Sequence, residues 1–483
     1  MKSPRRRNAH TQAHPPLRHT STVLLGAWLL SACVGSGYEV HPLDGRAERT
    51  WTEVEVSRVR AASRPPTKRA GTVPAELLAI LARVDEESSS IQAAYAGTRA
   101  DREEVGVARS QYYGELTPFA STEHLDAPRL VSPLSPPIQI GSLPFDDDQY
   151  HLGIQARVPI DLNGRIGAEV RRAQDAHLAS RAESDNLRLA VLHSASLLYW
   201  NLAALEGNRT ALETQRRALE EHIRLAREAI RVGRLAEVEL LRLQAELDGI
   251  EGSIAAVDGQ EASLRANLAA LMRVDAFDTS VTPAIPPPPA LPDELGDWSS
   301  RPDLIAARLR VEEAAEAVRA AEARRLPDVA VGGSITHNAG YTADGDTISD
   351  IGIFLTWPAF DGGRRSSAAR AARARYGAAK RMLEEVTDRA RAEVLSARAA
   401  WKAAERRHAA AVSSTAAARR TTEIQAKRFD DGRLSATDLV DAEAAQRRAE
   451  AEVAASLAAW WAADDALQRA LGAPPLGYRE PTL

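Results

Sequence analysis

Few side chains in this sequence have the types and spacing that catalysis, phosphate binding or metal binding requires. The only His-x-x-x-His pair, His10 and His14, lies close to the N-terminus, and the other histidines form no cluster with metal-ligand spacing. The glycine-rich segment 361–364 lacks the Gly-Lys-Ser/Thr ending of a phosphate-binding loop, and no Gly-x-Ser-x-Gly occurs. The sequence therefore predicts no enzyme activity, no cofactor and no metal site.

The single cysteine, Cys33, is the one candidate for covalent chemistry. A basic start and a short apolar run, 23–30, precede it, which is typical of an export signal. The stretch Leu30 to Cys33 resembles the lipobox of bacterial lipoproteins. That resemblance implies a signal peptide over 1–32, acylation of Cys33 and a lipid-anchored N-terminal extension over 33–74. A plain secretory signal with a nearby cysteine is the alternative.

Composition narrows the classes of protein further. The 483 residues are 44% hydrophobic and 26% charged, with a formal net charge of −5. This is too polar for a protein of many membrane-spanning helices, and it lacks the basic excess of a nucleic-acid-binding protein. One cysteine also excludes an intramolecular disulfide framework. Packing must hold the chain together.

The elements that position these residues occur twice, at an offset of 199 residues. Residues 153–165, which contain Pro159, Gly164 and Arg165, match residues 352–364, which contain Pro358, Gly363 and Arg364. These six residues are expected at the two junctions between a strand and a long helix. The segment 232–235 matches 431–434 in the same register. We interpret the chain as a tandem duplication, with halves at 75–282 and 301–475, a Pro-rich connector at 283–300 and a tail at 476–483.

Partway along each half, apolar and polar residues alternate, which is typical of strands with one apolar face. The expected strands lie at about 115–123, 150–159, 328–336 and 349–358. Their length suits tilted strands of a membrane barrel. On periodicity alone, an ordinary soluble hairpin fits equally well.

Each half then becomes helical over a long range free of proline, with expected helical hairpins at 164–272 and 363–472. Past Gly233, leucine and isoleucine recur at alternating spacings of three and four, with one missed position at Glu261. This is the pattern of coiled-coil packing. Gly233 and Gly432 are the expected turning points, because glycine tolerates positive φ.

Taken together, these features resemble the TolC-type outer-membrane efflux proteins, specifically their lipid-anchored branch. The most specific motifs are residues 301–304 at a helix start and residues 429–442 around the second glycine turn. The resemblance implies an α+β membrane protein in which three chains share one 12-stranded outer-membrane β-barrel, four strands from each, that continues into a periplasmic barrel of long helices. Four strands from one chain cannot close a membrane barrel.

The resemblance also implies site residues. Asp438 and Asp441, one helical turn apart, match a pair of aspartates that lines the constricted periplasmic mouth, where a ring of carboxylates favours cations. The alternative is that they only stabilise the helix dipole. The turns between paired helices are expected to dock the adaptor, and they comprise Gly233, Arg234, Leu235, Gly432, Arg433 and Leu434.

By this resemblance, the chain is expected to be a passive exit duct anchored in the outer membrane and extending into the periplasm. Its expected partners are two further copies, a periplasmic adaptor, an inner-membrane pump and lipid. The exported substrate is not encoded in these features. Two alternatives stay open: the duct of a type I protein-secretion system, and a coiled-coil structural lipoprotein or adaptor that forms no channel.

Overall fold

The structure, a computed structural model, describes residues 73–133, 143–232, 236–279, 287–291, 297–430 and 435–478. The chain divides into two units, Met1–Trp51 and Thr52–Leu483, and all described residues belong to the second. None of the helices in these residues combines the length and apolar character that a membrane-spanning helix requires.

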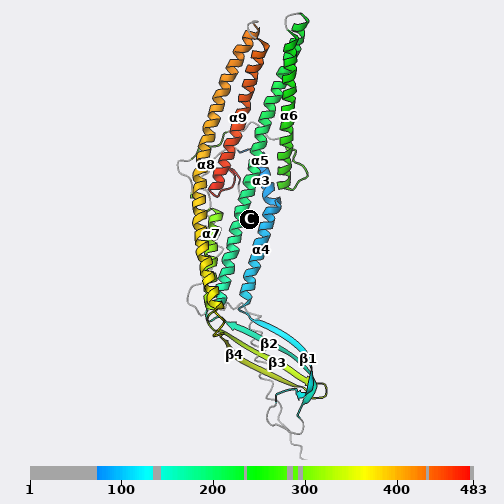
Figure 1. The fold of residues 1–483 in the computed structure, drawn as a ribbon, viewed down its shortest axis with the longest axis vertical. Coiled ribbons are helices and arrows are strands. Elements are labelled where there is room, and N and C mark those ends of the chain that lie inside the picture. Colours follow the sequence, from blue (N-terminus) through cyan, green and yellow to red (C-terminus); the bar gives the residue numbers. More distant parts are fainter. Residues whose placement is uncertain are drawn as a thin grey trace, which may run out of the picture. The chain divides into compact units, whose positions relative to one another are not determined.

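Long helices dominate the second unit (Figure 1). The helices are α3 (Ala75–Glu87), α4 (Ser89–Ser110), α5 (Arg165–Arg231), α6 (Glu237–Met272), α7 (Pro302–Ala323), α8 (Arg364–Asp430) and α9 (Ala436–Ala470). Both α5 and α8 have 67 residues, and they begin 199 positions apart. The same order of elements therefore recurs in the two halves, whereas duplication itself stays an interpretation of the sequence.

The strands form one antiparallel sheet in the order β1-β2-β3-β4. They are β1 (Glu115–Leu130), β2 (Phe145–Ile160), β3 (Asp328–Gly340) and β4 (Asp346–Thr356). The first three extend past the expected ends, since backbone pairing continues where the alternation of side chains has stopped. Strand β4 ends earlier than expected, before Pro358, which has no N–H to donate.

The helices lie side by side in a fixed order. Around the C-terminal ends of α5 and α8 the order is α6-α5-α9-α8, and nearer the strands it is α4-α5-α7-α8 (Figure 1). Helix α8 therefore forms one end of the array along its whole length, while α4 and α6 share the other end. Each end helix has a face that no neighbouring described helix covers.

The predicted heptad positions pack between α5 and α6. Leu219, Ile223, Leu243 and Ile250 are buried together, as coiled-coil packing requires. The missed position, Glu261, is also buried, and its carboxylate accepts hydrogen bonds from Arg209 (3.2 Å) of α5 and Arg265 (2.7 Å). An ion-paired carboxylate thus replaces an apolar side chain in the seam.

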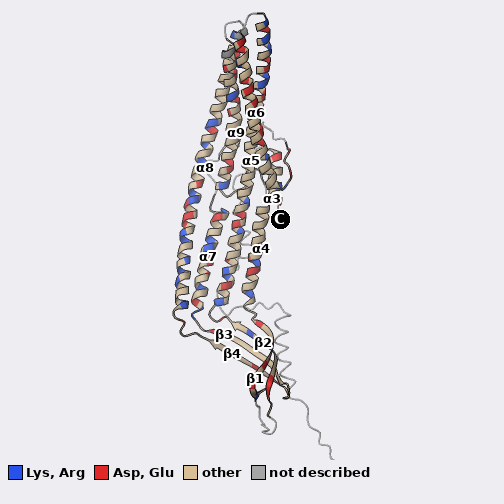
Figure 2. Cartoon of the chain, turned by 45° about the vertical axis from the view of Figure 1, so that its right-hand side comes forward, with Lys and Arg blue, Asp and Glu red and all other residues tan. Residues whose placement is uncertain are grey.

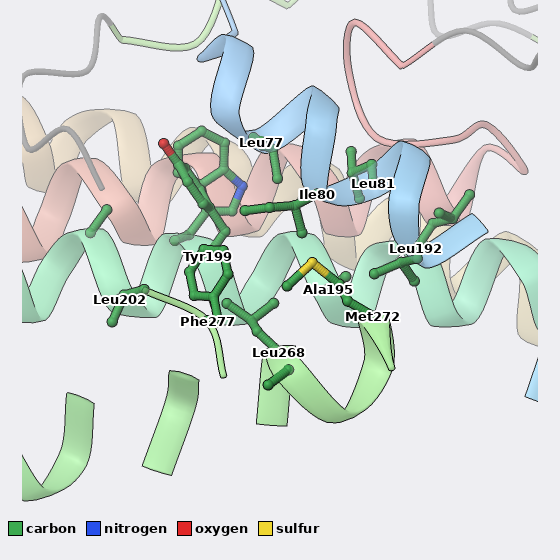
Figure 3. Close-up of a cluster of buried hydrophobic side chains, with 14 of the residues drawn as sticks. Leu77, Ile80, Leu81, Leu192, Ala195, Tyr199, Leu202, Leu268, Met272 and Phe277 are labelled. Carbon is green, nitrogen blue, oxygen red and sulfur yellow. The ribbon is translucent and has the colours of Figure 1, made fainter. Parts of the chain in front are cut away.

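A second core joins α3 to the long helices (Figure 3). Leu77, Ile80 and Leu81 of α3 pack on Leu192 and Tyr199 of α5, and α6 contributes Leu268 and Met272. Full burial of each aliphatic side chain contributes about 1.5–3 kcal/mol. These contacts explain how the short helix α3 is held against the bundle.

Two adjacent tryptophans of α9 pack against the neighbouring long helices. Trp461 stacks on Trp200 of α5 with ring centroids 4.8 Å apart, and Trp460 meets Trp401 of α8 edge to face at 5.4 Å. Each pair joins α9 to a different long helix.

Two neighbouring carboxylates of α9 accept the indole N–H groups of those long helices. Trp200 Nε1 donates to Asp465 Oδ2 at 2.9 Å, and Trp401 Nε1 donates to Asp464 Oδ1 at 2.8 Å. Ser196 also donates to Asp465. The pKa of Asp465 is raised to about 7, mainly by burial and also by the adjacent Asp464 carboxylate, which together outweigh the lowering effect of the hydrogen bonds from Ser196 and Trp200.

We predict that Asp465→Asn removes part of the pH dependence of stability. The pKa of this carboxyl is higher in the folded than in the unfolded chain, where it is about 3.9, so the folded state binds the proton more tightly. The stability that protonated Asp465 adds to the folded state is fully present below about pH 4, and it is lost as pH rises through 7. Thermal unfolding in detergent between pH 4 and 8 should therefore show a flatter profile for the variant.

The matched control is Asp388→Asn, because Asp388 is an exposed residue of α8. This variant should keep the pH profile of the wild type. Identical pH profiles for Asp465→Asn and the wild type would contradict this role of the buried carboxyl.

Candidate functional site: an open sheet and its junctions with the helices

Alternate side chains of the four strands form one apolar face. Cross-strand pairing places Ile154 beside Ile335, and Val331 between Val158 and Ile353. Further members of this face are Leu116, Leu152, Ile160, Ile351 and Leu355. Ile351 is 78% exposed, so none of the described elements covers this face. An uncovered apolar surface of this kind marks contact with lipid or with another protein.

The opposite face of the sheet is polar and internally hydrogen-bonded. His151 and Asn338 share a hydrogen bond of 2.7 Å across β2 and β3, and Ser334 donates to Asp350 at 2.5 Å across β3 and β4. The alternation predicted from the sequence thus separates an apolar from a polar face, as in strands that have lipid on one side and water on the other.

Exposed aromatic side chains mark both ends of the sheet. Phe145 and Tyr341 lie at one end, whereas Trp357 and Phe360 lie at the end that leads into α8. Phe360 is 90% exposed. Aromatic residues bordering an apolar band are typical of membrane barrels, where amphipathic rings lie at the headgroup level.

Strand β2 turns into α5 within four residues. Pro159 is the second-to-last residue of β2 and lies beyond the end of β1. Proline has no N–H to donate, and at this position β1 has no residue that would need that donor. Gly164 has a φ of +70°, a conformation that favours glycine, and it directly precedes the helix. Arg165 then lies 3.5 Å from both Glu169 and Asp328, which connects the two halves at this junction.

Asp161, which the sequence analysis did not select, caps this helix. Its two carboxylate oxygens accept the backbone N–H groups of Ile166 (2.9 Å) and Gly167 (2.8 Å). Asn163 accepts the N–H of Arg165 at 3.2 Å. These side chains satisfy donors that the first turn of any helix leaves free.

The second junction uses the same chemistry. Gly362 and Gly363 both have positive φ, at +63° and +86°. Asp361 accepts the N–H groups of Gly363 (3.0 Å) and Arg365 (3.1 Å) and the Nε–H of Arg365 (2.7 Å). The Arg365 guanidinium lowers the pKa of the Asp361 carboxyl, and Arg365 also donates to the carbonyl of Pro358. Arg364, the residue selected from the sequence, is exposed instead.

A signal for both caps was present in the sequence, since an aspartate precedes each Gly-Arg pair by two or three residues. Residues 361–363 lie in the short segment between β4, which ends at Thr356, and α8, which begins at Arg364.

Asp438 and Asp441 lie in the first two turns of α9. The Asp438 N–H donates to Ser435 Oγ at 3.1 Å, and the Ser435 hydroxyl donates to the Asp438 carboxylate at 2.6 Å. Asp438 is therefore part of a reciprocal cap. Asp441 is exposed, with no hydrogen bond or ion pair to any residue that the structure describes.

Other predicted site residues lie outside the described residues. They are the lipid-attachment residue Cys33 and the turn residues Gly233, Arg234, Leu235, Gly432, Arg433 and Leu434. Within the described residues there is no group of three or more side chains that could hold a metal ion.

Sequence comparison gives the family to which this chain, with its open sheet and long paired helices, belongs. The profile of the family described as "Outer membrane efflux protein" matches residues 80–272 and 298–473. The chain belongs to the outer membrane efflux protein family, which confirms the resemblance noted from the sequence.

Individual relatives are more distant. The chain is 32% identical over 218 residues to Protein CyaE of Bordetella pertussis, and the match covers 41% of this chain and 45% of that protein. The chain thus matches less than half the length of this relative.

Solved structures share the fold. The outer membrane protein VceC of Vibrio cholerae has a TM-score of 0.69 at 22% identity, covering 83% of this chain and 97% of that chain. The CmeC outer membrane channel of Campylobacter jejuni has a TM-score of 0.71 at 18% identity, covering 84% and 87%.

We predict that Asp161→Ala destabilises the junction by about 0.5–2 kcal/mol, because two backbone donors at the start of α5 lose their acceptor. Asp161→Asn keeps one acceptor oxygen and should lose less. Denaturant unfolding in detergent measures both. Equal stability of the Ala variant and the wild type would show that water replaces the carboxylate at no cost.

Proposed function

We propose that this protein is a passive exit duct in the outer membrane, formed by three copies. The observation that carries the proposal is the sheet, which has an exposed apolar face, a polar face and two edges, β1 and β4, that pair with no other strand among the described residues. Membership of the outer membrane efflux protein family supports the same function.

Lipid is the occupant that suits the apolar face. The shortest strand, β4, has 11 residues, and about 9–11 residues suffice for a tilted strand to cross a bilayer. In hydrocarbon, however, each unpaired backbone group costs several kcal/mol, so both sheet edges need partners. Three sheets of four strands joined edge to edge give a closed barrel of twelve strands.

In this arrangement, the long helices extend the barrel into the periplasm. Helices α4, α6 and α8 present uncovered faces at the ends of each array, as a ring of three arrays requires. The turns around Gly233 and Gly432 would then dock the periplasmic adaptor of an inner-membrane pump, and acylated Cys33 would add a lipid anchor.

The mouth of the duct is assigned to Asp438 and Asp441. Both carboxylates are exposed near the same helix start, and three copies would place six of them in one ring. In a narrow space such a ring focuses negative potential and favours cations.

We predict that Ile351→Arg on the apolar face reduces the stability of the barrel in lipid by about 2–4 kcal/mol, the cost of an arginine near the middle of a bilayer. Thr336→Arg, on the polar face, is the matched control and should cost much less. Urea unfolding in lipid vesicles measures the difference. Equal costs for the two arginines would contradict lipid contact at the apolar face.

We also predict that the pair Asp438→Asn and Asp441→Asn raises single-channel conductance and weakens block by multivalent cations. Asparagine at 438 keeps an acceptor for Ser435, so the cap is retained. Ser435→Ala is the control, because it loses the cap, at about 0.5–2 kcal/mol, and keeps both charges. Conductance and cation block unchanged in the double variant would leave the carboxylates with only a capping role.

A further inference from the structure

The two ends of the sheet carry opposite charge. At the end that leads into α8, residues 364–381 contain seven Lys and Arg and no Asp or Glu. At the other end, residues 145–148 and 341–346 contain five Asp and no Lys or Arg. Figure 2 shows the basic residues along the first turns of α8, next to the sheet. A membrane crossed by this sheet would therefore meet a basic surface on the helix side only.

Three arginines at the helix end have no carboxylate partner among the described residues. They are Arg325, in the turn after α7, and Arg364 and Arg370 on α8, and all three are exposed. Arg370 donates only to the Ser367 hydroxyl of its own helix, at 2.9 Å. The nearby carboxylates are bonded to other arginines, namely Asp361 to Arg365 (2.7 Å), Glu322 to Arg373 (2.6 Å) and Glu169 to Arg324 (3.0 Å). The three exposed charges are thus left for a partner outside the chain.

Hydrogen bonds hold these charges at the edge of the apolar face. Trp357 stands two residues after Leu355 of that face, and its indole N–H donates to the carbonyl of Arg325 at 3.2 Å. Arg365 donates to the carbonyl of Arg324, also at 3.2 Å. The turn after α7 and the start of α8 therefore meet directly beside the apolar surface.

The rise along α8 limits which arginines can act on a layer of lipid headgroups. Arg370 lies six residues after Arg364, about 9 Å along the helix. This is close to the Debye length at physiological ionic strength, about 8 Å. The next exposed arginine, Arg375, lies about 16 Å from Arg364, where salt screens its charge. Each copy therefore presents three effective cations at this level.

We propose that Arg325, Arg364 and Arg370 bind the phosphate groups of anionic phospholipids, in the leaflet that meets the helix end of the sheet. The inference rests on the proposed barrel in the outer membrane, where this is the periplasmic leaflet. Guanidinium groups recognise phosphate by charge and by paired N–H donors. The acyl chains of the same lipid lie on the apolar face beyond Trp357. A phospholipid matches both surfaces, whereas a free phosphate matches only the charge.

The test measures which lipids stay with the intact protein. The protein is reconstituted in vesicles of equal parts phosphatidylglycerol and phosphatidylcholine and extracted in detergent, and the retained lipids are counted by mass spectrometry. One basic residue near an anionic surface gives about a fivefold preference, so the wild type should retain at least about fivefold more phosphatidylglycerol. R325Q/R364Q/R370Q should lose this preference. R325K/R364K/R370K should keep most of it, because the charges remain.

The matched control, R406Q/R420Q/R428Q, removes three exposed charges from the part of α8 far from the sheet and should behave as the wild type. Equal loss in the two glutamine variants, a preference that survives in R325Q/R364Q/R370Q, or a wild type that retains both lipids equally would overturn the inference. Displacement of the retained lipid by excess inorganic phosphate would also overturn it, since the site would then bind free anions. A protein that never inserts into the vesicles would instead refute the proposed function.

Discussion

The backbone groups at the two edges of a four-stranded sheet set the main constraint on this protein. Every N–H and C=O in a lipid environment needs a partner, and within the part of the chain that the structure describes β1 and β4 each have one edge that no strand pairs. The apolar face of the sheet favours contact with lipid, but a single copy in lipid would leave the backbone groups of both sheet edges without hydrogen-bond partners. In the proposed duct, assembly of the copies and insertion into the membrane therefore depend on each other.

The junctions transmit this constraint to the helices. Asp161 and Asp361 fix the first turn of α5 and α8 directly behind a strand, so the direction of each long helix depends on the sheet. The buried carboxylates Asp464 and Asp465 then attach α9 to both helices through indole hydrogen bonds. An array built this way is held together by contacts between its helices, while its end helices keep uncovered faces.

Much of this fold could be predicted from the sequence, because period-2 and heptad patterns report which side of an element is buried. The apolar face around Ile154 and the seam around Leu243 followed from those patterns. The capping role of Asp161, the partner Arg209 for Glu261 and the indole donors for Asp465 did not. The contacts of Glu261 and Asp465 depend on residues that only folding brings close, and no periodicity encodes them. The cap has a local signal instead, an aspartate two or three residues before each Gly-Arg pair, which lies outside any periodic pattern.

The most direct test of the central claim is an image of the intact protein in detergent at a resolution that separates strands. Our account predicts a hollow particle with threefold symmetry, in which β4 of each copy pairs with β1 of the next and twelve strands close a barrel. A monodisperse particle of one chain, with both sheet edges free in the detergent, would contradict it.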